Sequence, residues 1–152
     1  MPDRAREEPA AFTWHRLFRR YLALMIVLNL VWEVVQLPLY TLWREGTASG
    51  IAFAVLHCTG GDIIIATLAL VASLLILGDA AWPRSGYWPV AGLAIAMGFL
   101  YTVYSEWMNA VTRATWAYSP LMPILPFAGI GLSPLLQWLL LPWLSFRLAR
   151  RT

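Results

Sequence analysis

Four stretches of the chain are apolar over lengths close to what a helix needs to cross a bilayer: residues 21–43, 51–77, 88–110 and 132–148. A transmembrane helix uses about 20 predominantly apolar residues. Lipid offers the backbone no hydrogen-bond partner, so such stretches span as helices. Hydrophobic residues make up 60% of the 152 residues, whereas soluble domains contain roughly 45–50%. The sequence therefore predicts an all-α polytopic membrane protein, a four-transmembrane-helix bundle forming one domain over residues 1–152.

The segment before the last apolar stretch, residues 112–131, departs from this pattern. Pro120, Pro123 and Pro126 oppose a continuous helix, because each proline removes a backbone donor and crowds the preceding turn. The segment is nevertheless more apolar than an ordinary loop. We therefore expect a re-entrant or interfacial segment before the last helix, since non-helical backbone at membrane depth is tolerated only against protein or water.

The basic residues predict how the chain is oriented. All 11 are arginines, and nine of them precede the first stretch, separate the second from the third, or follow the fourth; only Arg44 and Arg113 lie in the other connections. The positive-inside rule then places both termini in the cytoplasm of a multi-pass cell-membrane (inner-membrane) protein. The arginines form no single patch, so we expect membrane lipids as partners and no nucleic acid.

Ionisable side chains inside the apolar stretches give the best indication of function. A charge at the centre of a membrane helix costs at least about 2.5 kcal/mol, so such groups usually mark functional sites. The stretches contain five such residues: Glu33, His57, Cys58, Asp62 and Glu106. We interpret Glu33, His57, Asp62 and Glu106 as candidate catalytic residues.

Depth and helical spacing predict that these groups meet. At about 1.5 Å per residue, all of them fall in the outer half of the membrane. Asn29, Glu33 and Gln36 follow a helical spacing of four and three residues, and Thr102, Glu106 and Asn109 repeat it. Such faces turn inward in a bundle, which predicts one polar pocket. The expected ligand-binding residues around it are Gln36, Asn109, Trp116, Tyr118, Gln137 and Trp138.

Two readings of these polar groups remain open at this level. The carboxyl groups of Glu33 and Glu106 either exchange protons with a substrate or form hydrogen bonds that hold the helices together. Similarly, Gly60 and Gly61 either mark a break in the second helix or allow close packing by a neighbour.

A metal site at His57, Cys58 and Asp62 is a weaker hypothesis. Structural zinc sites use several cysteines or histidines, and the only other histidine, His15, lies in the arginine-rich lead. We expect neither a metal nor another cofactor.

The chain is similar in layout to the sterol isomerase and sigma-2-receptor group. The shared layout is four spans with acids and a histidine that face an interior pocket. The similarity concerns architecture only, and no motif matches residue by residue. Two functions follow from the residues. The first is acid–base chemistry on a lipid-like or isoprenoid-like substrate in the pocket. The second is a transport or accessory role in a homo-oligomer or larger membrane complex, with the polar faces carrying protons or ligands or contacting another chain.

Overall fold

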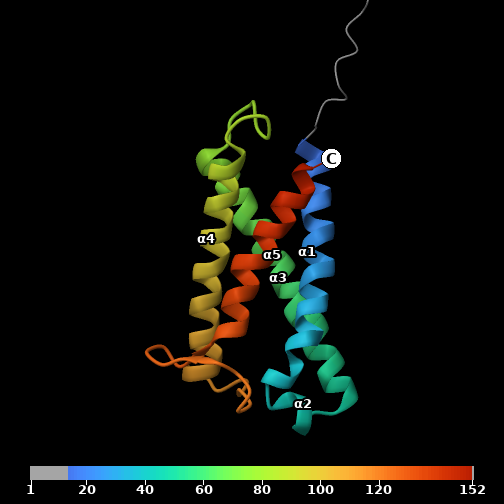
Figure 1. The fold of residues 1–152 in the computed structure, drawn as a ribbon, viewed down its shortest axis with the longest axis vertical. Coiled ribbons are helices and arrows are strands. Elements are labelled where there is room, and N and C mark those ends of the chain that lie inside the picture. Colours follow the sequence, from blue (N-terminus) through green and yellow to red (C-terminus); the bar gives the residue numbers. More distant parts are fainter. Residues whose placement is uncertain (1–13, 152) are drawn as a thin grey trace, which may run out of the picture.

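The structure is a computed structural model that describes residues 14–151. It is mostly helical, with a short two-stranded antiparallel sheet before the last helix (Figure 1). In chain order the elements are α1 (Trp14–Gln36), the 3-10 helix η1 (Leu37–Leu39), α2 (Leu42–Glu45), α3 (Ala48–Leu77), α4 (Tyr87–Glu106), the π-helix η2 (Trp107–Thr112), β1 (Ile124–Leu125), β2 (Ile130–Gly131) and α5 (Leu132–Arg150).

Within residues 14–151, three helical segments are long and apolar enough to cross a membrane: Trp14–Leu39, Ala48–Leu77 and Tyr87–Thr112. The fourth predicted span is not confirmed, although α5 forms a helix over nearly the predicted residues. Buried Gln137 and the arginines Arg147 and Arg150 of its last turn reduce its apolar character. The structure thus agrees with a multi-pass membrane protein and leaves the role of α5 as a prediction.

The first helix differs from its predicted bounds at both ends. It begins at Trp14 rather than at residue 21, and its α-helical part ends at Gln36 rather than at residue 43. Pro38 follows directly and lies in the first turn of η1. A residue before proline is disfavoured in the α conformation, so the chain changes helix type here and then turns into α2.

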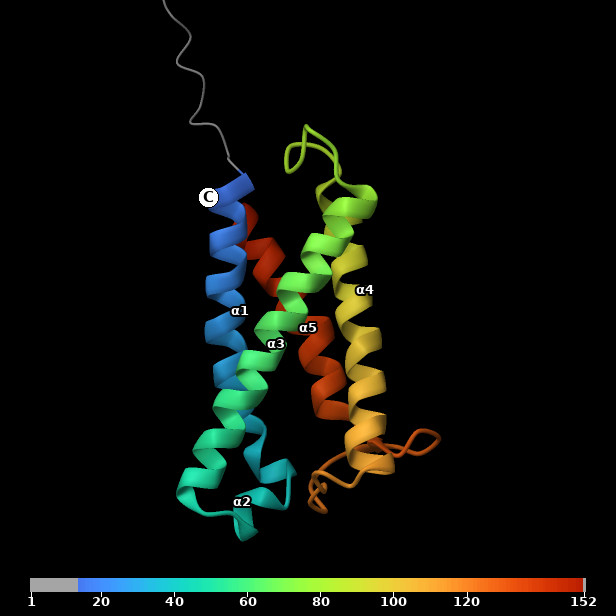
Figure 2. The ribbon, with the colours of Figure 1, turned by 180° about the vertical axis from the view of Figure 1, so that it is seen from behind.

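The long helices pack in a closed order, with α1 against α3 and α5, and α4 against α3 and α5. The start of α1, the end of α5 and the connection between α3 and α4 lie at one end of the molecule, which we call the terminal end (Figure 1). The other end, which we call the α2 end, carries α2 and the segment between α4 and α5. Seen from behind, α3 runs diagonally, close to α4 at the terminal end and away from it at the α2 end (Figure 2).

The hydrophobic core fills the half of the molecule toward the terminal end. Tyr21 of α1 stacks on Phe146 of α5 with ring centroids 4.3 Å apart. The Tyr87 hydroxyl of α4 donates a hydrogen bond of 2.6 Å to the Phe146 carbonyl. Between α3 and α4 the buried side chains are small, including Ala66 and Ala94, and small residues let helices approach closely. Most of the buried polar side chains, including Glu33, Glu106 and Gln137, lie in the other half, although Ser73 and Ser145 are buried in this one.

Helix α3 is continuous through Gly60 and Gly61. Neither expected role is observed: the helix does not break there, and a Cβ added at either glycine would meet no atom within 4 Å. These glycines therefore leave open space beside α3 rather than a close contact.

Two connections join at the α2 end, and together we call them the cap (residues 37–41 and 115–119). Thr41 N donates to Ala117 O at 3.0 Å, and Ser119 N donates to Leu39 O at 2.9 Å. The Ser119 hydroxyl adds a bond of 2.8 Å to the Pro38 carbonyl. The Pro-rich segment is therefore tied by its backbone to the connection after α1. Its re-entrant or interfacial position stays a prediction.

Candidate functional site

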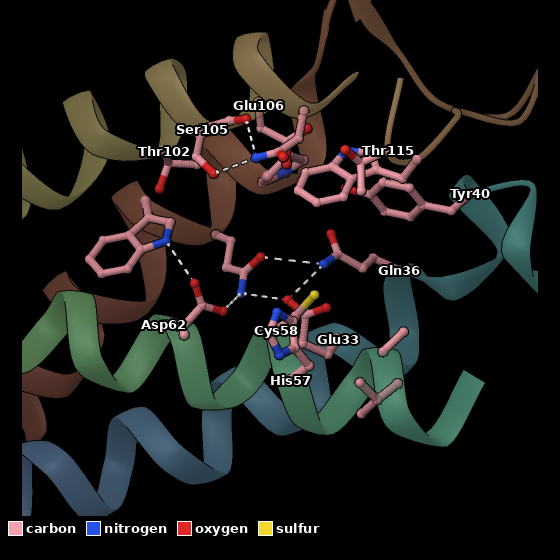
Figure 3. A pocket seen from close by; sticks show the side chains of 18 of the residues that line it. Glu33, Gln36, Tyr40, His57, Cys58, Asp62, Thr102, Ser105, Glu106 and Thr115 are labelled. Carbon is pink, nitrogen blue, oxygen red and sulfur yellow. Dashed lines mark hydrogen bonds between the residues drawn. The ribbon is translucent and has the colours of Figure 1, made fainter. Parts of the chain in front are cut away.

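A cavity of about 450 Å³ lies between the helices in the half of the molecule toward the α2 end (Figure 3). Each of the four long helices contributes to it: Glu33 and Gln36 come from α1, Asp62 from α3, Glu106 from α4 and Gln137 from α5. In Figure 3, Glu33 and Asp62 lie on one side of the hollow and Glu106 lies on the other. The predicted meeting of polar faces from separate helices is thus observed.

Gln137 of α5 connects the side chains on the first side. Its Nε2 lies 2.9 Å from Asn29 Oδ1, 3.1 Å from Glu33 Oε1 and 2.9 Å from Asp62 Oδ2. An amide nitrogen carries two protons, so only two of these three acceptors are served at a time. The three acceptors therefore compete for the two protons of this amide, and Glu33 Oε1 has a second donor in Gln36 Nε2.

Gln36 extends this network toward the α2 end. Its Nε2 donates to Glu33 Oε1 at 2.9 Å, and its Oε1 accepts a 2.9 Å bond from the Ser133 hydroxyl. Ser133 in turn accepts a 3.2 Å bond from the Trp32 indole. Gln36, Ser133 and Gln137 are all buried, so the network fixes how α1 meets α5.

Asp62 is held by a second donor from α5. The Trp138 indole donates to Asp62 Oδ1 at 3.2 Å, while Gln137 serves Oδ2. Successive residues of one helix thus supply both donors for this carboxyl group. Trp138 is almost fully buried and belongs to the hydrophobic core, so Asp62 lies where the core and the cavity meet.

Glu106 has a different environment, at the end of α4. Its Oε2 accepts a short hydrogen bond from the Tyr118 hydroxyl of the cap. Burial and this bond to Glu106 raise the pKa of Tyr118 above its ordinary value of 10.0. Tyr118 therefore remains a protonated donor at neutral pH. Tyr118 does not itself line the cavity, and acts through Glu106.

Other predicted ligand-binding residues lie along the same wall. Asn109 and Trp116 line the cavity. Asn109 Nδ2 donates to the Ser105 carbonyl at 2.9 Å and to its hydroxyl at 3.3 Å, which ties it to its own helix. The Tyr40 ring of the cap lies 5.6 Å from that of Tyr118, so aromatic side chains close this end.

His57 and Cys58 also line the cavity. His57 is exposed and stacks on Phe53, with ring centroids 5.5 Å apart, and it lies at the rim of the cavity. Cys58 is half-buried and free. Within residues 14–151, no group of three or more His, Cys, Asp and Glu side chains is arranged to hold a metal ion.

The cavity contains acids without cations. None of the described side chains that line it belongs to Arg or Lys. Glu33, Asp62 and Glu106 accept hydrogen bonds from amides, an indole and a phenol. A cationic or hydrogen-bond-donating group could thus be bound by the carboxyl groups, whereas a phosphate would meet no cation.

Gly98 of α4 contributes to the shape of the site, and the sequence did not indicate this. The Trp138 ring lies directly against its backbone, where a Cβ would overlap the ring. The sequence offers no signal for this, because glycine is common in membrane helices and its role depends on what packs against it.

Compared with known proteins, the chain matches no family model, no curated protein and no solved structure. The functional argument therefore depends on the geometry of the site alone.

Proposed function

We propose that the protein is an integral membrane protein that binds a lipid-like or isoprenoid-like molecule in this cavity and performs acid–base chemistry on its polar end. The observation that carries the proposal is that three carboxyl groups from three helices, Glu33, Asp62 and Glu106, line one cavity in which no lining residue of the described chain is Arg or Lys. Intramembrane acids usually mark substrate or proton pathways.

The chemistry proposed uses the two sides of the cavity differently. Glu33 and Asp62 share the amide of Gln137, whereas Glu106 is bound by the Tyr118 phenol. Carboxyl groups in unlike environments can take opposite roles as proton donor and acceptor. We assign Glu106 and the Glu33–Asp62 pair to these two roles on opposite sides of the ligand, with His57 as a proton exchanger at the rim.

The proposed topology places this cavity in the outer half of the membrane. Helix α5 completes a four-transmembrane-helix bundle, and both termini lie in the cytoplasm of a cell-membrane protein. The distribution of arginines supports this. Seven of the described arginines, the first being Arg16 and the last Arg151, lie toward the terminal end. The other two, Arg44 and Arg113, lie toward the α2 end. Cytoplasmic segments are the ones enriched in arginine.

A transport or accessory role is the second candidate. It would use the polar faces for contact with another chain, in a homo-oligomer or a larger complex. The buried polar groups bond to one another across α1, α3 and α5 of the same chain, and this favours the first proposal.

Lipids that co-purify with the full-length chain test the proposal. Mass spectrometry of wild-type protein should find an amphiphile enriched over the bulk membrane extract. Glu33→Gln and Glu106→Gln should each reduce that enrichment while the melting temperature stays near wild type. Glu45→Gln is the matched control, since Glu45 is exposed on α2 and does not line the cavity. Unchanged lipid content in both cavity variants, or loss only together with folding, would contradict the proposal.

A further inference from the structure

We propose that the ligand reaches the cavity sideways from the bilayer, through an opening between α3 and α4, rather than from the aqueous end of the helices. This inference rests on the proposed function for the nature of the ligand, but its structural basis is separate. It assigns an entrance with Gly61 and His57 of α3 on one side and Tyr101 of α4 on the other.

The first observation is that α3 and α4 close against each other on one side of the cavity only. Toward the terminal end, the Ser73 hydroxyl lies 3.8 Å from Met97 Sδ, and Ala66 and Ala94 are both buried. Toward the α2 end the two helices diverge (Figure 2). Here residues from both helices line the cavity instead of packing together, including Ala54, Gly61, Tyr101 and Ser105.

The second observation is the open space beside the glycines of α3. A Cβ at Gly61 would have no neighbour within 4 Å, although Gly61 lines the cavity. His57 and Tyr101 also line the cavity and are both exposed, Tyr101 to 50%. Residues that line a cavity and are also exposed mark where it reaches the surface. Thr115 of the cap is a further residue of this kind, so the labelling experiment below has to distinguish the side opening from the α2 end.

The third observation is the cap. Backbone hydrogen bonds between residues 39–41 and 117–119 cross the α2 end, and the Tyr40 and Tyr118 rings of the same two connections lie 5.6 Å apart. A ligand that entered from this end would have to pass the joined connections. The side opening needs no such rearrangement.

The surface around the side opening is suited to lipid chains. Phe53 and Ile64 of α3 and Leu100 of α4 are exposed to 68%, 62% and 65%. Large exposed apolar surfaces of this kind are covered by lipid in a membrane protein. An amphiphile in the same layer can therefore move its polar end to the carboxyl groups while its chain stays in contact with the bilayer.

The native thiol of Cys58 provides a test that requires no ligand. Cys58 lines the cavity and is the only cysteine of the chain. We would reconstitute the full-length protein in phosphatidylcholine liposomes and compare labelling by pyrenylmaleimide, which partitions into the bilayer, with labelling by a sulfonated maleimide, which stays in water. Pyrenylmaleimide should react several-fold faster.

Two pairs of variants locate the opening. Gly61→Leu should slow labelling by pyrenylmaleimide several-fold, whereas Gly60→Leu should not, because Gly60 is exposed and does not line the cavity. Tyr101→Ala should accelerate labelling, and Tyr104→Ala, exposed but not lining the cavity, should not. Circular dichroism checks that helix content is preserved in all four.

Several outcomes would overturn the side opening. Faster labelling by the sulfonated reagent would place the entrance at the aqueous end, and equal effects of Gly60→Leu and Gly61→Leu would remove the difference between the two faces. Equal rates of labelling by pyrenylmaleimide in wild type and Tyr101→Ala would show that Tyr101 does not border the entrance. None of these results depends on the lipid content of the Glu33→Gln and Glu106→Gln proteins, so the side opening and the proposed function fail separately.

Discussion

The Trp138 ring lies against the backbone of Gly98, so close that a Cβ at Gly98 would overlap the six-membered ring. The same indole donates a 3.2 Å hydrogen bond to Asp62. Gly98 on α4 therefore allows a tryptophan of α5 to reach a carboxyl group of α3. Three helices depend on this one small residue for their relative positions at the base of the cavity.

Gly98→Ala should destabilise the protein by about 1–3 kcal/mol, the usual cost of overpacking a core. The added methyl group must displace Trp138 and so lengthen its bond to Asp62. Thermal unfolding in detergent and the tryptophan emission spectrum measure the two effects. Gly92→Ala on the same helix is the control, because a Cβ there meets nothing within 4 Å. Equal stability of the two variants would contradict the close contact.

Gln137→Met should also destabilise the protein, by about 1–3 kcal/mol, because buried acceptors lose their donor. Gln137 lies within hydrogen-bond distance of Asn29, Glu33 and Asp62, and methionine has a similar size without an N–H. Denaturant unfolding measures the change. Leu136→Met is the control, since Leu136 is the exposed neighbour on α5. A Gln137→Met protein as stable as this control would show that the amide network contributes little.

Glu106 and Tyr118 should be energetically coupled. A double-mutant cycle of Glu106→Met with Tyr118→Phe should give an interaction energy of about 0.5–3 kcal/mol, as expected for groups in direct contact. The raised pKa of Tyr118 keeps its hydroxyl protonated at neutral pH, so the phenol can donate to Glu106 when the cycle is measured at that pH. Tyr40→Phe with Glu106→Met is the control cycle, because no hydrogen bond joins Tyr40 to Glu106 among the described residues. Additive effects of Glu106→Met and Tyr118→Phe would contradict the contact.

Much of the fold can be read from apolar length and helical spacing. Each predicted stretch overlaps one long helix, α1, α3, α4 or α5. The spacing of Asn29, Glu33 and Gln36 placed all three on the buried face of α1. Both signals are local in the chain, since they depend only on a helix and on the cost of polar groups in lipid.

Features that depend on contacts between distant segments could not be predicted. The cap is held together by backbone hydrogen bonds between residues 39–41 and 117–119. Such bonds cannot be predicted from the identity of the side chains. His57 lines the same cavity as the acids, but the sequence did not indicate that it would be exposed and stacked on Phe53. Its position on α3 was evident, but the direction in which α3 diverges from α4 decides what it faces.

The position of α5 relative to the membrane is decided by reporters fused to the two ends of the chain. If α5 crosses, an even number of spans places both ends on the same side, and the arginines predict the cytoplasm. A reporter active only in the cytoplasm should then work at either terminus, and one active only outside should work after Arg44 or Arg113. Since α5 is not among the helices apolar enough to span by themselves, its burial against α1 and α4 would have to support the crossing. An external C-terminus with a cytoplasmic N-terminus would leave three spans and exclude the four-span bundle.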